Sequence, residues 1–370
     1  MYRFCLSFYY FFCLFLKQRR YDIVFYYPQH FNRGKKGEND FFKHYYKVCK
    51  EKKLSYIIFE EPYSGSVRNK ETIPFDLIFF LIVILRKLFC NQDILEKDRR
   101  IGKFLAATIF RNIEFKNFIV LSKSMLSVFS AIQPSCRIFD NQHGIIYPNK
   151  SSYFKIEGVS KHLVKNDVYL LIFGDEFRNI LIKEDSTDFM KANSYIIGSP
   201  PLLNNVNHRA FNNNVLVTLQ FTHDHNTDEN LKLLEELHNC IHSASNNITF
   251  HLKHHPRFNN EVDLSETLKL SNVKLAPNHI SDCFKICSLH VTAYSTSTFE
   301  SALLGIPTIL INGSQFNFFE RDFNYPLQYS IADFHDNIIY KRGSVIVKQW
   351  AKQFYQPFCE ESFLKVLKNV

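Results

Sequence analysis

The stretch AYSTSTFESALLGIPTILI, residues 293–311, has the pattern of a strand that ends in a polar turn, a short helix and a second buried strand. The turn consists of Ser295, Thr296, Ser297 and Thr298. Glu300 follows near the helix start, and Gly-Ile-Pro at 305–307 ends the helix. Hydroxyl groups and backbone N–H groups at a helix start bind phosphate, helped by the helix dipole. The stretch therefore predicts a β-α-β unit with a phosphate site at its turn.

Two interpretations of this turn stay open. The hydroxyl groups either bind a phosphate or only cap the helix. Glu300 either completes a capping box or accepts hydrogen bonds from the two hydroxyls of a ribose. The phosphate and ribose interpretations together would make this stretch a nucleotide site.

Strand-like and helix-like segments alternate on both sides of this stretch. Apolar runs of strand length lie at 21–27, 54–61, 117–122, 136–142, 167–174, 194–200, 214–221, 247–256 and 273–277. Segments with helical spacing separate many of them, such as 228–244, where Asp228 is the expected N-cap. This alternation is typical of parallel sheets covered by helices, so we predict an α/β protein.

The alternation is interrupted once, at 200–214, where the chain is rich in Pro and Asn and lacks periodicity. We predict an N-terminal domain at 1–203, a linker at 204–213 and a C-terminal domain at 214–345. C-terminal helices at 346–370 either stay with the second domain or cross back to the first. Both domains are expected to be Rossmann-like, with parallel sheets facing a central cleft, and ligands in such sheets bind at the carboxyl ends of strands.

One strand end in the first domain, FDNQHGII at 139–146, combines polar residues with a glycine. Asp140, Gln142 and His143 are expected to project into the cleft, next to Gly144. A histidine there suits a general base, because its ordinary pKa lies near working pH. Asp140 is a second catalytic candidate. The alternative is a turn in which Asp140 and Asn141 satisfy backbone groups.

A strand end in the second domain, HLKHHPR at 251–257, ends in His255, Pro256 and Arg257. Histidine and arginine at a strand end suit a diphosphate or a sugar phosphate. The alternative is a surface turn with incidental charge.

Two further strand ends have weaker signals. Gly198, just before the linker, is expected to allow close backbone approach at a hinge. Glu60 and Glu61 end a strand of the first domain and form either a reserve general base or a solvated turn.

Composition and charge restrict the classes of partner. The chain is 46% hydrophobic and 22% charged, as expected for folded cores. Lys and Arg number 45 against 36 Asp and Glu, and the resulting net charge of +9 favours anionic partners. No RNA-binding motif or zinc-finger spacing is present, so we expect no nucleic-acid partner. Nine scattered cysteines without a C-x-x-C pair predict reduced thiols and a cytoplasmic location.

Two apolar runs leave alternatives open. The run at 4–16, followed by basic residues up to 20, is a buried first element, an interfacial membrane anchor or an upstream mis-start. The run at 75–89 is a buried helix or a membrane-facing one. Neither reaches the roughly 18–20 apolar residues that span a bilayer.

Taken together, these residues resemble the GT-B superfamily of glycosyltransferases over about residues 136–312. His255-Pro256 resembles the "HP" motif of bacterial sialyltransferases, which contacts the nucleotide. The residues at 295–298 resemble their "SS/T" motif, which holds the donor phosphate. Glu300 with Gly-Ile-Pro at 305–307 is similar to the wider GT-B pattern. Gln142-His143-Gly144 resembles the "HG" element of CDP-glycerol glycerophosphotransferases, where the His is a proposed base.

The chain departs from both subfamilies at one place. The acidic pair that precedes a Gly in the sialyltransferases is absent, and residues 140–144 read Asp-Asn-Gln-His-Gly instead. Gln142 stands where the glycerophosphotransferases have Trp. Neither subfamily is therefore matched.

The resemblance implies an enzyme that transfers a sugar from a nucleotide-sugar donor to a surface glycan, such as capsule, O-antigen or lipooligosaccharide. It implies that 1–203 is the acceptor-binding domain and 214–345 the nucleotide-sugar-binding domain. A glycan or lipid-linked acceptor is expected, with peripheral contact to an anionic inner membrane face as one alternative. No cofactor or catalytic metal is expected, since the chain has no D-x-D triplet. The alternative functions are a CDP-glycerol-type polyol-phosphate transferase, a UDP-sugar 2-epimerase and a non-catalytic sugar-nucleotide-binding assembly protein.

Overall fold

The chain forms two compact units, which are Met1–Pro200 with Pro357–Val370, and Pro201–Gln356. The computed structural model describes residues 2–32, 34, 37–63, 68–89, 93–200, 206, 208–221, 226–255, 262–311 and 318–369. The predicted C-terminal segment, 346–370, is divided between the units. Helix α14 (Asn337–Phe354) belongs to the second, and α15 (Glu360–Asn369) belongs to the first.

The first unit is built on a seven-stranded sheet in which every neighbouring pair is parallel. Its strands, in spatial order, are β3 (Ile73–Pro74), β2 (Tyr56–Glu61), β1 (Arg19–Pro28), β4 (Ile113–Leu121), β5 (Arg137–Asn141), β8 (Val168–Ile172) and β9 (Ser194–Ile196). A short antiparallel pair, β6 (Phe154–Lys155) and β7 (Gly158–Val159), stands apart from it.

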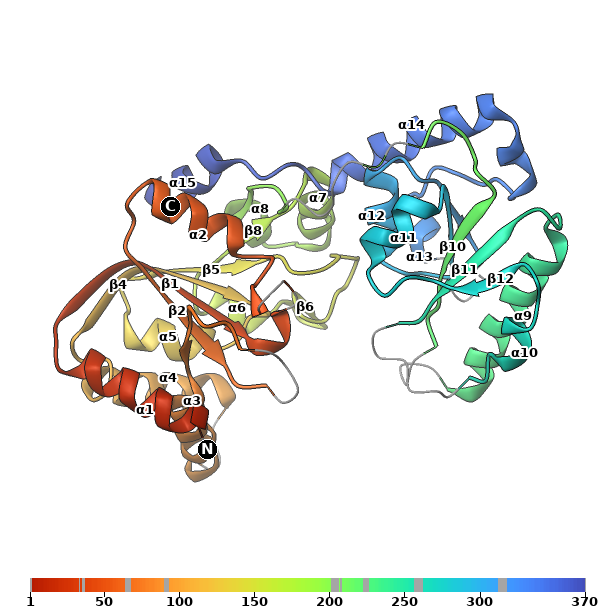
Figure 1. Ribbon diagram of the computed structural model, residues 1–370. Helices are drawn as coiled ribbons and strands as arrows, with labels where there is room; N and C mark the ends of the chain where they lie inside the picture. Colours follow the sequence, from red (N-terminus) through yellow and green to blue (C-terminus); the bar gives the residue numbers. More distant parts are fainter. Residues whose placement is uncertain are drawn as a thin grey trace. The chain divides into compact units, whose positions relative to one another are not determined.

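Helices cover both faces of this sheet (Figure 1). They are α1 (Tyr2–Phe15), α2 (Lys43–Glu51), α3 (Asp76–Leu88), α4 (Ile94–Ala107), α5 (Leu126–Ile132), α6 (Lys161–Val164), α7 (Asp175–Glu184), α8 (Phe189–Asn193) and α15. The central strand β1 shows how the two faces fill. Phe25 packs with Tyr45 of α2, whereas Tyr26 on the other face packs with Phe75 and Phe129. Both faces of β1 are buried, which explains its nearly continuous apolar sequence.

The second unit has a five-stranded parallel sheet. Its strands, in spatial order, are β12 (Val273–Leu275), β11 (Thr249–Lys253), β10 (Asn214–Thr218), β13 (Leu289–Thr292) and β14 (Thr308–Leu310). Its helices are α9 (Thr227–Ser243), α10 (Ser265–Leu268), α11 (Ile280–Ile286), α12 (Ser297–Leu303), α13 (Phe318–Phe323) and α14.

The N-cap of α9 differs from the prediction. Asn226, not Asp228, caps the helix, because its side chain accepts from Glu229 N at 2.9 Å while Glu229 accepts from Asn226 N at 2.9 Å. This capping box satisfies two N–H groups at once, which an Asp228 cap would not do.

The chain leaves the first unit and returns to it at one place. Gly198 has φ +83°, and a Cβ atom there would overlap the Pro357 carbonyl oxygen. Cys359 N donates to Ile197 O at 2.8 Å, so the returning segment pairs beside the departing one. The close approach predicted at Gly198 is therefore to the returning chain.

Candidate functional site

Each sheet has a point at which strand order reverses along the chain. In the first unit β1 leads to β2 and β3 on one side, and the chain then crosses to β4 on the other. In the second unit β10 leads to β11 and β12, and the chain then crosses to β13. The loops after such strands diverge and leave a crevice at the carboxyl edge, which is where ligands bind in open α/β sheets. These two edges are therefore the places to look for functional side chains.

His143 lies in the loop after β5 and is half-buried. Its ring centroid is 5.4 Å from that of Phe31, in the loop after β1. Burial, and next the ammonium groups of Lys150 and Lys123, lower the pKa of His143 to about 4. The imidazole is therefore neutral at pH 7 and available to accept a proton. The protonated ring is disfavoured, because it would place a positive charge in a buried position near two ammonium groups. The pKa of His143 therefore lies below the ordinary histidine value, first because of burial and then because of the two lysines, which the sequence did not bring together. The role of His143 as base stays a prediction.

Asp140 and Gln142 were predicted to project from the same strand end, and this prediction was wrong, since each is 1% exposed. Asp140 Oδ1 accepts from Lys123 N at 3.0 Å, and its Oδ2 lies 3.7 Å from Lys123 Nζ. Gln142 accepts from Phe173 N and donates to Gly144 O, both at 2.8 Å. These contacts hold the loop that presents His143, so both residues are positioned to support it.

Gly144 opens space beside His143. A Cβ atom built at Gly144 would have no heavy atom of the described residues within 4 Å. Its φ is not in the left-handed region, so the backbone conformation does not require glycine. The absent side chain instead leaves this position of the loop open.

Two lysines of this site were not singled out from the sequence. Lys123 is the second residue after β4, in a turn where Ser122, Lys123 and Met125 all have positive φ. Such backbone strain is concentrated at functional sites. Lys123 Nζ lies 3.3 Å from the centroid of the Tyr153 ring, and Lys150 Nζ lies 5.9 Å from the same centroid. The position of Lys123 just past the end of a buried strand was the available sequence signal.

In the second unit, a buried histidine organises the edge of the sheet. His290 on β13 is fully buried, and burial lowers its pKa to about 3. Its Nε2 lies 2.9 Å from Thr218 Oγ1 and 3.3 Å from Ser297 Oγ. This network joins β10, β13 and the first residue of α12, and it fixes where the polar turn begins.

Several hydrogen-bonding groups of the polar turn at 295–298 pair with one another inside the turn. Ser297 and Thr298 are buried. Phosphate binding by this turn stays a prediction. Ser297 N donates to Ser295 Oγ at 3.3 Å, and Thr298 N donates to Ser295 O at 3.0 Å. Thr296 is exposed and Ser295 is half-buried. The accessible hydroxyl groups of the turn are therefore those of Ser295 and Thr296.

Glu300 lies one turn into α12 and does not complete a capping box, because the N-cap Thr296 has no side-chain cap. Burial raises the pKa of Glu300 to about 7. The carboxyl group also lies close enough to Tyr355 to raise the pKa of that phenol. Because burial disfavours the ionised form, a ligand that donates hydrogen bonds to this carboxylate would stabilise it.

His255 follows β11 by two residues and is half-buried. Pro256 and Arg257, predicted to complete this phosphate contact, lie outside the described residues. His255 and the turn at 295–298 follow β11 and β13, the two strands that flank β10. Among the described residues, no group of three or more His, Cys, Asp or Glu is arranged to hold a metal ion. Metal-free chemistry stays a prediction.

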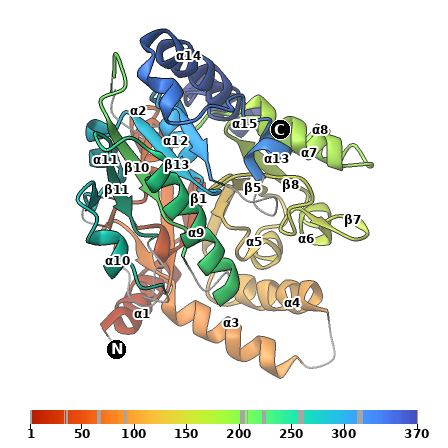
Figure 2. The same cartoon turned by 90° about the vertical axis from the view of Figure 1, so that its right-hand side faces the viewer.

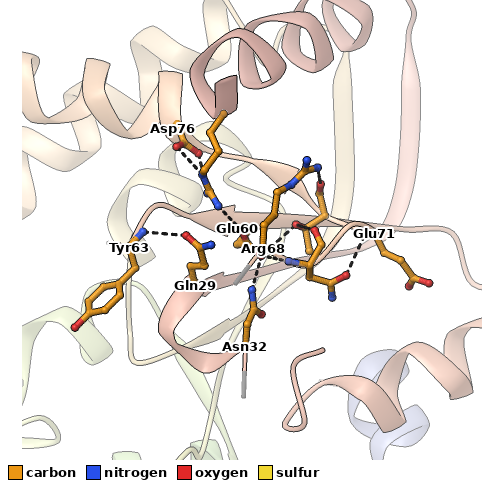
Figure 3. Close-up of polar contacts among 10 residues, drawn as sticks. Gln29, Asn32, Glu60, Tyr63, Arg68, Glu71 and Asp76 are labelled. Carbon is orange, nitrogen blue, oxygen red and sulfur yellow. Dashed lines mark hydrogen bonds and ion pairs between the residues drawn. The ribbon is translucent and has the colours of Figure 1, made fainter. Parts of the chain in front are cut away.

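Glu60 and Glu61 both have hydrogen-bond partners at their strand end, and Figure 3 shows those of Glu60. Glu60 is fully buried, so the expectation of a solvated turn was wrong. Arg3 Nη1 donates to it at 2.8 Å and Asn32 Nδ2 at 2.7 Å, and Arg3 also forms a two-pronged ion pair with Asp76. Glu61 accepts from the Tyr26 hydroxyl at 2.7 Å. The cluster in Figure 3 therefore attaches α1 to the sheet, and neither carboxylate is an available base.

No protein-family model matches the sequence, and comparison with curated proteins gives no significant match. Three solved structures are similar in fold. The UDP-GlcNAc 2-epimerase from Methanocaldococcus jannaschii has a TM-score of 0.56 at 11% identity, covering 95% of this chain and 100% of its own. A mutant of TarM from S. aureus, in complex with fondaparinux, alpha-GlcNAc-glycerol and UDP, has a TM-score of 0.56 at 9% identity, covering 94% and 100%. The glycotransferase of kitacinnamycin has a TM-score of 0.53 at 9% identity, covering 94% and 99%. At these identities the likeness concerns the fold, and the chain has the α/β architecture of two Rossmann-like units termed GT-B.

Proposed function

We propose that this protein is a glycosyltransferase that moves a sugar from a nucleotide-sugar donor to a glycan or lipid-linked acceptor. The second unit binds the donor. Glu300 accepts hydrogen bonds from the ribose hydroxyls, and His255, with the hydroxyls of Ser295 and Thr296, contacts the phosphate groups. The first unit supplies the base. The UDP and UDP-GlcNAc in the names of the similar structures belong to those proteins and agree with a donor of this class.

In the proposed reaction, His143 accepts the proton of an acceptor hydroxyl, and the oxygen of that hydroxyl forms a bond to the anomeric carbon of the sugar. The bond from that carbon to the phosphate oxygen breaks, and its electron pair leaves with the nucleotide. Hydrogen bonds to the phosphate oxygens stabilise the charge that develops there.

The observation that supports this proposal most is the position of Glu300. Its carboxyl group stands at the carboxyl edge of the second sheet, and burial raises its pKa to about 7 although no described cation pairs with it. A structural carboxylate in such surroundings is usually paired or absent. Ribose hydroxyls would donate hydrogen bonds to this carboxylate.

Product analysis tests the proposal and separates it from its alternatives. The full chain is incubated with nucleotide sugars and cell-derived acceptors, and products are identified by mass spectrometry. A sugar added to acceptor with nucleotide released supports glycosyl transfer. Phosphate retained on the product with CMP released indicates a polyol-phosphate transferase, and an isomerised sugar nucleotide indicates a 2-epimerase. Nucleotide binding without any product would leave only the assembly-protein interpretation.

We further propose that the first unit rests on an anionic membrane surface through α1, α3 and α4. These helices lie on the same side of the first sheet in both views (Figures 1 and 2). The exposed aromatic side chains of α1 are Tyr2, Phe4, Phe8, Tyr9, Phe12 and Phe15. Phe4 contacts the exposed Phe80 of α3, with ring centroids 6.2 Å apart, so the apolar surface is continuous across the two helices. Within the described residues, every helix falls short of what crossing a membrane requires.

The surroundings of this surface support a lipid partner. A groove of about 490 Å³, lined by phenylalanines of α1, ends at the exposed Arg111. Lys17, Arg100 and Lys103 are exposed nearby on the same helices or just after them. Apolar helix faces flanked by basic residues bind the interface of anionic bilayers.

Vesicle sedimentation tests the membrane contact. The double variant Phe8→Ser, Phe12→Ser should lose binding to vesicles that contain phosphatidylglycerol. Leu231→Ser, a change at a similarly exposed apolar residue of α9, should keep it. Equal binding by both variants would remove α1 from the contact.

A further inference from the structure

The loops after β4 and β5 bring an excess of positive charge to the site of His143. Lys123 and Lys150 contribute two ammonium groups, and Asp140 is the carboxylate beside them. Asp140 Oδ2 lies 3.7 Å from Lys123 Nζ, and the Asp140 side chain is fully buried. One buried carboxylate cannot neutralise two ammonium groups, and His143 and His30 add no negative charge.

The surroundings make this excess costly. The Lys123 side chain is 12% exposed and stands over the Tyr153 ring. Lys150 Nζ donates to the Ile145 carbonyl oxygen and faces the Tyr147 and Tyr153 rings. Burial, and then repulsion by Lys123, lower the pKa of Lys150 to about 8. Unpaired buried charges are rare in proteins unless they serve a ligand.

The loop that carries His143 is open at Gly144, where a Cβ atom would meet no heavy atom of the described chain within 4 Å. An oxyacid anion accepts hydrogen bonds from ammonium groups and offsets their positive charge. The shared chemistry is that of a phosphate or a carboxylate group.

We propose that Lys123 and Lys150 bind an anionic group, a phosphate or a carboxylate, that the acceptor has next to the hydroxyl group it presents to His143. This inference rests on the proposed function and specifies its acceptor as an anionic glycan or glycan phosphate. The anion has a second effect, because it offsets the two ammonium groups that disfavour the imidazolium. Acceptor binding thereby makes His143 a stronger base only when the substrate is present.

The test follows the imidazole by NMR. The full chain is labelled with 13C-histidine, and the His143 signal is assigned by its loss in His143→Gln. The signal is titrated with pH in the presence of methyl phosphate, acetate or no addition. A nearby negative charge should raise the pKa of His143 by about 1–3 units. A rise with methyl phosphate alone assigns a phosphate group, and a rise with both anions assigns carboxylates as well.

Two lysine variants provide the control. Lys150→Gln should abolish the rise, whereas Lys155→Gln, at an exposed lysine of β6 in the same segment, should keep it. Lys150 is the better target, because loss of Lys123 would leave Asp140 buried without its partner. Circular dichroism confirms that each variant is folded.

Three outcomes would overturn the proposal. They are no rise with either anion, a rise that persists in Lys150→Gln, and a rise caused by UDP that Lys150→Gln removes. The last outcome would assign the lysines to the donor diphosphate. Failure of the proposed function itself would appear separately, as absence of nucleotide binding dependent on Glu300.

Discussion

Replacing Glu300 by Gln should stabilise the second unit at alkaline pH and leave it unchanged in acid. Burial raises the pKa of Glu300 from 4.5 to about 7 in the folded chain. Between these values the folded state keeps a proton that the unfolded state releases, so stability falls as pH rises through this window. At 1.36 kcal/mol per pH unit, the loss reaches about 3 kcal/mol above pH 7. The amide cannot ionise, so Glu300→Gln avoids this loss.

The single tryptophan makes the measurement specific. Trp350 stacks on Phe299, the neighbour of Glu300, with ring centroids 4.8 Å apart, and its fluorescence reports the second unit alone. Urea unfolding is followed at pH 4.5 and pH 8.5 for both proteins. The variant should match the wild type at pH 4.5 and exceed it by up to about 3 kcal/mol at pH 8.5. Glu235→Gln, at an exposed carboxylate of α9, is the matched control and should show no such difference.

The same stability difference at both pH values would refute the reasoning. It would mean that Glu300 ionises as readily in the folded chain as in water, and that the carboxyl group has no unmet demand for donors. The ribose assignment would then lose its physical basis.

Three further predictions concern other parts of the chain. Gly198→Ala should destabilise the first unit by at least about 1–3 kcal/mol in thermal unfolding, because φ is +83° and the Cβ overlaps Pro357 O. Asn226→Ala should cost about 1 kcal/mol in urea unfolding, since it removes the capping box of α9; no change would show that the cap is dispensable. His143→Ala should lower the transfer rate by roughly 10²–10⁴-fold in the product assay without altering nucleotide affinity, and an unchanged rate would exclude it as the base.

The strands and their order of appearance were predictable, because buried parallel strands give uninterrupted apolar runs. The runs at 21–27 and 117–122 correspond to β1 and β4, which pair at the centre of the first sheet. The polar residues after the strands also lie at the carboxyl edges, as parallel pairing requires. The sequence therefore indicated the fold and the loops in which both candidate sites lie.

Side-chain direction and distant partners were not predictable. Asp140 lies near the end of β5, and Gln142 and His143 follow that strand. Only His143 of the three is partly accessible, because the turn of the loop decides which side chains point inward. Lys123 and Lys150 come from separate loops, and only the pairing of β4 with β5 brings them to one site. Their effect on the pKa of His143 could not be inferred without that pairing.

The central claim is that the second unit binds the nucleotide of a sugar donor through Glu300. Isothermal titration of the full chain with CMP, CDP, UDP and GDP, in the presence of EDTA, tests it most directly. We predict that one of these nucleotides binds without a metal ion. Glu300→Ala should weaken it by roughly ten- to a hundredfold, as expected for the loss of hydrogen bonds to a charged group. Binding of no nucleotide, or equal binding by wild type and Glu300→Ala, would contradict the account.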